Sequence, residues 1–475
     1  MVGRQNELRL LDNALERKEA QFVAVYGRRR VGKTYLIRQK FNDRFAFWHT
    51  GLARTGLVGQ LANFRDSLVK YGQRDCPPLA GWREAFLQLE KVIAANRARK
   101  CVVFIDEMPW MDTPRSGFVS ALEHFWNGWA CARNNLVLVV CGSSASWIVK
   151  KIFRDHGGLH NRVTDQIHLA PFTLGECEAY VRERGMSFSR MDIGQLYMVF
   201  GGVPYYWSLL EKGKSVEQNV DSLVFAERGK LRNEFNDVFF SLFRNGESYR
   251  TVVRALSTVK EGVTRDELLR KTGLPDCGKF TDCLDDLEQC GFVRRYTSFG
   301  KKKRDAQYQL IDNFSLFHLK FLEGESNPDE HFWSHSTLST ALNVWRGLAF
   351  ERLCLQHVPQ IKKALGISGV LTRVFSWRHV PDDVYVNGAQ IDLLIERADR
   401  VVNICEMKYA KEPYVINKAY DLALRTKQGT FMQLTGNRLA PHLTMITANG
   451  LVHNAYWNTI QSEVTLDDLF ANASC

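Results

Sequence analysis

Glycine, lysine and threonine residues follow an early apolar run at a spacing that suits phosphate binding. Residues 26–34 read Tyr-Gly-Arg-Arg-Arg-Val-Gly-Lys-Thr, between an apolar run at 22–25 and a helical stretch at 35–41. Glycines let the backbone wrap around a phosphate, and the N–H groups at the start of the helix point at it. The sequence therefore predicts a phosphate-binding loop made by Gly27, Arg28, Arg29, Arg30, Val31, Gly32, Lys33, Thr34 and Tyr35. Lys33 is expected to reach the β- and γ-phosphates, and the Thr34 hydroxyl to bind Mg²⁺.

Two carboxylates end a second apolar run. Asp106 and Glu107 follow residues 101–105, which are typical of a strand buried in a parallel sheet. Ligands of open α/β sheets bind at the carboxyl ends of the strands. We expect Asp106 to hold the Mg²⁺ and Glu107 to polarise the attacking water. Together with the loop, this predicts a protein that binds and hydrolyses a nucleoside triphosphate.

A second set of chemically competent residues lies near the end of the chain. Asp392 is expected on one strand, and Glu406 and Lys408 lie two apart on the next, so both project from the same face. Glu351, on a preceding helix, could supply a further ligand. Two carboxylates and a lysine suit phosphodiester hydrolysis assisted by Mg²⁺ or Mn²⁺. A solvated hairpin with a cross-strand ion pair is the alternative.

Composition bounds the compartment and the partners. The chain has 475 residues, enough for about three domains. Its first residues lack the apolar stretch of a signal peptide, and no run approaches the ~20 residues of a membrane span, which predicts a cytoplasmic protein without a membrane partner. Eleven cysteines without C-x-x-C pairs indicate buried thiols in a reducing compartment. A net charge of +11 makes a polyanionic partner plausible.

The segments between these motifs predict further domains. Residues 171–245 are expected to be helical, and residues 246–322 to form three helices and a hairpin with a basic tip at 299–304. In the second of these helices, Thr264 and Glu267 form a capping box. The pattern looks like a winged helix-turn-helix.

The third helix of that pattern argues against sequence-specific DNA reading. It carries several acidic residues on its outer face and only one basic residue, and acids repel phosphates. Nonspecific contact by the hairpin, or a purely structural packing role, is favoured. The residues concerned are Asp276, Asp282, Asp285, Glu288 and Lys279.

A linker at 323–340 is expected to lead into a last α/β domain at 341–475. Its predicted elements are a helix at 342–356, strands at 370–377, 390–395 and 401–408, a helix at 414–427 and a strand at 430–434.

The opening Val2-Gly3-Arg4, with Glu7 and Leu8, resembles AAA+ ATPases and their STAND relatives. That resemblance implies a γ-phosphate sensor at Ser143 or Ser144, which end the strand 136–141. It also implies an arginine finger at Arg162, in cis or in trans, and a lid entered at the Gly-Gly-Val-Pro turn 201–204. A plain Gly-Ser turn and a solvated arginine are the alternatives.

Asp392, Glu406 and Lys408 match the signature of the PD-(D/E)xK nucleases, although the proline that often precedes the aspartate is absent. The whole chain resembles archaeal-type AAA+/STAND ATPases that carry a winged helix and a nuclease-like domain. This implies an α/β multidomain fold: a P-loop core at 1–170, a helical lid at 171–245, a winged helix at 246–322 and a restriction-endonuclease-like domain at 341–475.

The resemblance also implies ATP and ADP as ligands, Mg²⁺ as cofactor and possible homo-oligomers. The function expected is an ATPase that acts on nucleic acid, most simply DNA, and whose ATP state controls a C-terminal nuclease. The alternative is a STAND-type switch whose nuclease-like domain is inactive and binds DNA or protein.

Overall fold

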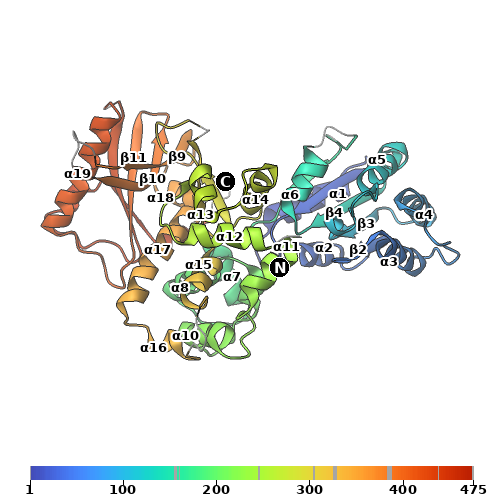
Figure 1. The fold of residues 1–475 in the computed structure, drawn as a ribbon, viewed down its shortest axis with the longest axis horizontal. Coiled ribbons are helices and arrows are strands. Elements are labelled where there is room, and N and C mark those ends of the chain that lie inside the picture. Colours follow the sequence, from blue (N-terminus) through green and yellow to red (C-terminus); the bar gives the residue numbers. More distant parts are fainter. Residues whose placement is uncertain are drawn as a thin grey trace.

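The computed structural model describes residues 2–154, 158–159, 161–243, 246–302, 305–324, 329–381, 388–436 and 438–472. In Figure 1 the chain runs from a sheet flanked by helices on the right, through a largely helical centre, to a second large sheet on the left. No helix among the described residues is long and apolar enough to cross a membrane.

The N-terminal sheet is parallel and buried on both faces. Its strand order is β2-β3-β4-β1-β5. Side chains of β1 alternate between two cores, since Phe22 and Ala24 pack in one and Val23 and Val25 in the other. Because β1, β3 and β4 are neighbours, their carboxyl ends meet at one edge. The strands are β1 (Gln21–Tyr26), β2 (Phe47–Thr50), β3 (Cys101–Asp106), β4 (Leu136–Gly142) and β5 (Asp165–His168).

Helices cover both faces of this sheet (Figure 1). Two helices lie between β2 and β3, and the short helix after β4 continues for one π-helical turn. The helices are α1 (Gln5–Glu16), α2 (Lys33–Phe41), α3 (Leu57–Lys70), α4 (Trp82–Ala95), α5 (Phe118–Gly128) and α6 (Ala145–Ile148), with the π turn η3 (Val149–Phe153).

Residues 171–245 are helical, as predicted. Three of the helices begin with complete capping boxes, at Thr173, Ser189 and Ser215. The helices are α7 (Leu174–Glu183), α8 (Arg190–Phe200), α9 (Pro204–Ser208), α10 (Val216–Val220) and α11 (Glu234–Leu242).

Residues 246–322, here called the middle module, contain the three helices and the hairpin that the sequence predicts. Thr264 and Glu267 form the expected capping box. The strands form an antiparallel sheet in the order β6-β8-β7. Lys303 and Arg304 of the basic tip lie outside the described residues. The elements are α12 (Gly246–Ser257), β6 (Val263–Thr264), α13 (Arg265–Thr272), α14 (Gly278–Gln289), β7 (Val293–Tyr296), β8 (Gln307–Leu310) and α15 (Asn313–Phe321).

The C-terminal sheet is mixed, with strand order β13-β12-β11-β10-β9. β9, β10 and β11 are antiparallel, whereas β11, β12 and β13 are parallel. The elements are α16 (Phe332–His335), α17 (Thr340–Gln356), α18 (Val358–Ala364), β9 (Thr372–His379), β10 (Ala389–Arg397), β11 (Val401–Lys408), α19 (Lys418–Leu434), β12 (Ala440–Thr447) and β13 (Ser462–Thr465).

The predicted strand at 430–434 is wrong, because α19 continues through it to Leu434. Leu424 and Phe431 are both buried and lie seven residues apart, two turns along one face of the helix. The short apolar run that suggested a strand is the end of that helical face.

Candidate functional site

The loop 26–34 is shaped by two glycines and closed by Lys33. A Cβ atom at Gly27 would lie 2.3 Å from the Leu169 carbonyl oxygen, so the backbones approach too closely for any other residue. Gly32 has a φ of +89° and precedes α2. The Lys33 ammonium donates to the carbonyls of Gly27 and Arg28, each at 2.9 Å. The loop therefore places a buried cation beside the first N–H groups of α2, an arrangement that suits a phosphate.

Thr34 and Asp106 meet at the edge of the sheet. The Thr34 hydroxyl donates to Oδ2 of Asp106 at 2.7 Å, and the Asp106 side chain is buried. Burial, and next the neighbouring charge of Glu107, raise the pKa of Asp106. A buried carboxylate next to a hydroxyl offers the hard oxygen ligands that Mg²⁺ prefers, so these residues fit the expected ion.

Ser143 holds Glu107. The Ser143 hydroxyl donates to Oε2 of Glu107 at 2.7 Å, and the Ser143 N–H donates to the same oxygen at 3.3 Å. Glu107 itself has a φ of +48°, in the left-handed region that costs a side chain about 1 kcal/mol. Of the two candidate sensor serines, Ser143 is the one that contacts the carboxylate expected to polarise water.

Two of the loop arginines point away from the expected nucleotide. Nη1 of Arg28 lies 2.5 Å from Oδ1 of Asp312, and both side chains are buried. Nη1 of Arg30 lies 2.9 Å from Oε2 of the buried Glu234. Their expected contacts with nucleotide are thus left to the backbone, because the side chains fasten the loop to the helical region and the middle module. Sequence reasoning missed these acids, which are more than two hundred residues away.

The remaining loop residues divide by exposure. Val31 packs in the core, whereas the side chains of Arg29 and Tyr35 are exposed at the surface. Only these last two offer free side chains to a ligand that lies outside the loop.

Arg162 is not brought to the loop. It is exposed and precedes β5, and the N–H of Thr164, two residues on, donates to the carbonyl of Phe22 at the start of β1. The loop follows the opposite end of β1. A finger role for Arg162 at this site therefore requires a second copy of the chain.

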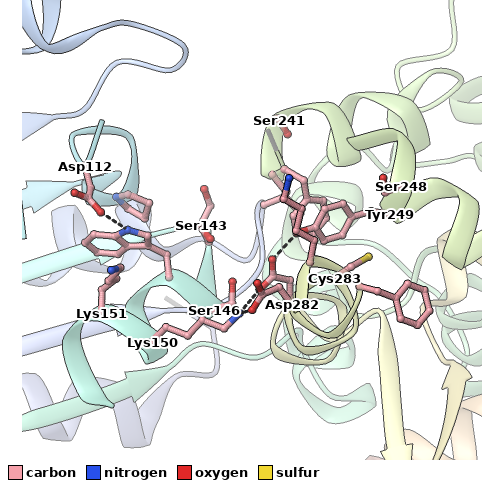
Figure 2. A pocket seen from close by; sticks show the side chains of 18 of the residues that line it. Asp112, Ser143, Ser146, Lys150, Lys151, Ser241, Ser248, Tyr249, Asp282 and Cys283 are labelled. Carbon is pink, nitrogen blue, oxygen red and sulfur yellow. Dashed lines mark hydrogen bonds and ion pairs between the residues drawn. The ribbon is translucent and has the colours of Figure 1, made fainter. Parts of the chain in front are cut away.

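A cavity of about 670 Å³ joins the ATPase edge to the middle module. Glu107 and Asp286 are among its lining residues, and Figure 2 shows Ser143 on one side and Tyr249 on the other. Lys150 crosses between the two sides: its ammonium lies 2.8 Å from Oδ1 of Asp282 and 3.3 Å from Oδ1 of Asp286. The Tyr249 hydroxyl donates to Asp286 at 2.6 Å.

These contacts account for part of the acidic character of the module's third helix. Asp282 and Asp286 of α14 face Lys150 of the ATPase core, and Asp276 pairs with Arg265 of α13 at 2.6 Å. Two of the four acids that argue against DNA reading, Asp276 and Asp282, thus serve contacts within the chain. The sequence shows the acids, but it does not show that the lysine lies opposite them.

The C-terminal candidates line one cavity of about 510 Å³. Glu351, Asp392, Glu406 and Lys408 all face it, as predicted from their strands and helix. Among the residues that the structure describes, however, no three His, Cys, Asp or Glu side chains lie close enough to hold one metal ion.

Each of these carboxylates is paired with a lysine. Lys427 and Lys408 lie 2.6 and 3.1 Å from Glu406, and Lys260 lies 3.0 Å from Glu351 and 3.7 Å from Asp392. Burial alone would raise the pKa of Glu406, but Lys427 and Lys408 outweigh it and lower that pKa.

Burial, and next the charge of Asp392, raise the pKa of Glu351 despite Lys260. Its Oε2 is buried without a hydrogen-bond partner. A buried carboxylate oxygen without a hydrogen-bond partner is a suitable ligand for a divalent cation that prefers oxygen. In this structure, however, lysine ammonium groups lie beside these carboxylates, where such a cation would bind.

Sequence reasoning missed Lys260 and Lys427, which line this cavity, and Tyr420, which contacts Glu406. Tyr420 donates to Oε1 of Glu406 at 2.9 Å. It precedes Lys427 by seven residues, and both lie within the helix predicted at 414–427, so helical periodicity could have found this pair. Lys260 comes from the middle module, and no local signal points to it.

Comparisons with known proteins agree with the N-terminal geometry. Residues 1–210 match the family described as an ATPase domain predominantly from Archaea. The uncharacterised protein MJECL04 of Methanocaldococcus jannaschii is 21% identical over 427 residues, which cover 86% of this chain and 87% of that protein.

Solved structures are similar as well. The Walker-type ATPase PABY2304 of Pyrococcus abyssi is 17% identical with a TM-score of 0.50, over 67% of this chain and 96% of that one. The STAND protein PH0952 of Pyrococcus horikoshii, which carries a tetratricopeptide repeat sensor, is 17% identical with a TM-score of 0.33, over 78% of this chain and 52% of that one. The first 210 residues contain an archaeal-type ATPase domain with a P-loop fold, and the protein is an ATPase.

Proposed function

We propose that ATP binding and hydrolysis control metal-dependent cleavage of nucleic-acid phosphodiesters at the C-terminal cavity. One observation carries the proposal: the middle module contacts both sites. Asp282 and Asp286 meet Lys150 beside the ATPase edge, and Lys260 enters the C-terminal cavity. A change at one site that moves the module is therefore felt at the other.

At the ATPase site, Lys33 binds the β- and γ-phosphates, and Thr34 and Asp106 hold Mg²⁺. The ion, when bound, neutralises charge that develops on the phosphates. Glu107 orients the attacking water and accepts its proton, while Ser143 fixes the direction of the Glu107 carboxylate through two donated hydrogen bonds.

At the C-terminal cavity, Asp392, Glu406 and Glu351 would supply oxygen ligands for Mg²⁺ or Mn²⁺ once the lysines that pair with them in this structure withdraw. Lys408 steadies negative charge on the phosphate. The position of the basic hairpin tip supports a DNA partner. The tip is fixed to the C-terminal sheet, since the N–H of Phe299 donates to the Ser376 carbonyl on β9 at 2.8 Å. This contact anchors Lys301 and Lys302, both exposed, beside the sheet that carries the carboxylates, where they can bind phosphates.

The test is cleavage of plasmid and linear DNA with Mg²⁺ or Mn²⁺, with and without ATP. Wild type is compared with Asp392→Ala and with a control, Asp399→Ala, which removes an exposed acid from the turn between β10 and β11. We expect cleavage that depends on ATP, survives in the control and is lost in Asp392→Ala. Equal cleavage by all three proteins would point to a contaminant and reject the proposal.

A regulatory switch is the second candidate, and the lysine pairs favour it. Each carboxylate of the C-terminal cavity already has a lysine partner. Such pairs neutralise the carboxylates without a metal ion, which suits a domain that only binds protein or DNA. This candidate predicts slow ATP turnover that DNA does not change, and tight retention of ADP. Fast turnover stimulated by DNA would reject it.

A further inference from the structure

Lys260 belongs to one part of the chain and acts in another. It lies in the turn between α12 and β6 of the middle module, and its side chain lines the C-terminal cavity. The backbone of this turn is fixed separately: the Lys260 carbonyl accepts hydrogen bonds from Gln309, at 2.8 Å, and from Arg352. Both donors are buried. The position of the turn therefore does not depend on the ammonium group.

The ammonium occupies a place suited to a cation. It lies 3.0 Å from Oε1 of Glu351 and 3.7 Å from Oδ2 of Asp392. It leaves Oε2 of Glu351 buried and without a hydrogen-bond partner. A divalent ion would use several such oxygens at once, and a positive charge already held between them repels it.

We propose that Lys260 is a gate: its ammonium takes the place of a divalent cation between Glu351 and Asp392 and leaves when the middle module moves. This inference rests on the proposed function, in which these carboxylates bind metal. The side chain keeps 38% of its surface exposed, so it can withdraw without opening a core. In this structure Glu406 is paired separately, with Lys408 and Lys427.

Helix α12 links the gate to the ATPase edge. Tyr249, in its first turn, donates to Asp286, which pairs with Lys150 beside the cavity that Glu107 lines. Lys260 follows the end of the same helix by three residues. Twelve helical residues span about 18 Å, and a helix of this length moves as a rigid unit. A shift of Asp286 can thus reach the turn that carries Lys260 along α12, and moving that turn requires breaking the hydrogen bond from Arg352 of α17.

The test measures Mn²⁺ binding to the full chain without nucleotide. Binding is detected as a decrease in the electron paramagnetic resonance signal of free Mn²⁺. The proteins are wild type, Lys260→Met, Lys260→Met with Asp392→Asn, and the control Lys271→Met, an exposed lysine of α13 in the same module. Mn²⁺ that binds elsewhere is common to all four proteins. Thermal melting checks the folding of each, and Lys260→Gln repeats the test with a polar side chain.

We expect Lys260→Met and Lys260→Gln to bind Mn²⁺ at least about tenfold more tightly than wild type. The double variant should lose this gain, and Lys271→Met should bind as wild type does. No gain in either Lys260 variant overturns the gate.

Cleavage assays separate the two proposals. Tighter Mn²⁺ binding by Lys260→Met without DNA cleavage by any protein keeps the gate and rejects the nuclease. Wild type that cleaves DNA and binds Mn²⁺ as tightly as Lys260→Met keeps the nuclease and rejects the gate.

Discussion

Within the part of the chain that the structure describes, the direction of the Glu107 carboxylate is set by one neighbouring residue, Ser143. Ser143 donates to it twice, through its hydroxyl and its N–H, and a serine-to-alanine change removes only the shorter bond. We expect Ser143→Ala to bind ATP normally and to lower kcat by up to about a hundredfold, because a misplaced base costs that much. Steady-state hydrolysis and titration with a nonhydrolysable analogue measure the two effects. Ser144→Ala is the control, and equal kcat values in both variants would contradict this role for Ser143.

Lys33 is the residue on which nucleotide affinity depends most. Its ammonium donates to two loop carbonyls at 2.9 Å and is poised to exchange them for phosphate oxygens. We expect Lys33→Ala to weaken ATP binding about tenfold to a hundredfold, the value of a charge-assisted hydrogen bond. Calorimetric titration measures it. Lys40→Ala, on the same helix but paired with Asp12, should bind as wild type does; unchanged affinity in Lys33→Ala would contradict the prediction.

At the scale of elements, local pattern predicts what local forces decide. The strand predicted at 401–408 has the same bounds as β11, because a short apolar run between turns is typical of a buried strand. The meeting of Thr34, Asp106 and Ser143 follows from parallel strands that share an edge. In contrast, the end of α19 was mistaken for a strand because the window was too short to show the helical period.

Tertiary partners were beyond the sequence. Arg28 and Arg30 have the residue types of a phosphate-binding loop, yet Asp312 and Glu234 take their side chains. Lys150 and Lys260 carry no motif and matter only because folding places acids opposite them. Each of these contacts joins separate parts of the chain, and spacing along the sequence has no bearing on it.

The contact of the loop with α11 predicts a dependence of stability on pH. Burial raises the pKa of Glu234 from 4.5 to about 7, and Arg30 opposes this rise only in part. A carboxyl group that holds its proton more tightly when folded stabilises the protein at pH values below 4.5 and loses this contribution as pH rises through 7.

We therefore expect the melting temperature of wild type to fall about 2–4 °C further between acidic and alkaline buffer than that of Glu234→Gln. Thermal melting at about pH 5 and about pH 8 provides the measurement. Asp237→Asn, which changes an exposed acid on the same helix, should retain most of the wild-type difference, because the charge of Asp237 raises the pKa of Glu234 less than burial does. The same pH dependence in wild type and Glu234→Gln would show that Glu234 does not titrate in this range.

At the scale of the whole molecule, the middle module lies between two sites and is held at each by a lysine. On one side Lys150 of the ATPase core pairs with α14, and on the other Lys260 of the module pairs with the C-terminal carboxylates. Figure 1 shows the module in the centre of the molecule, between the two large sheets. The module shares a hydrophobic core with the helical region and the C-terminal domain, and these ion pairs add polar contacts on its two sides.

The ion pairs of Lys150 predict the effect of reversing the charge of this residue. Lys150→Glu places a third acid beside Asp282 and Asp286 and should drive α14 from the ATPase core, since like charges this close repel. Hydrogen exchange followed by mass spectrometry should then show faster exchange in α14 and at the start of α12, with ATP affinity unchanged. The control is Lys151→Glu, because Lys151 lines the same cavity.

If α12 transmits the shift as a rigid unit, exchange in the turn at 258–262 should also rise in Lys150→Glu and not in Lys151→Glu. Faster exchange confined to α14 would instead show that the module yields locally, and that the ATPase edge and the C-terminal cavity are not coupled through this helix.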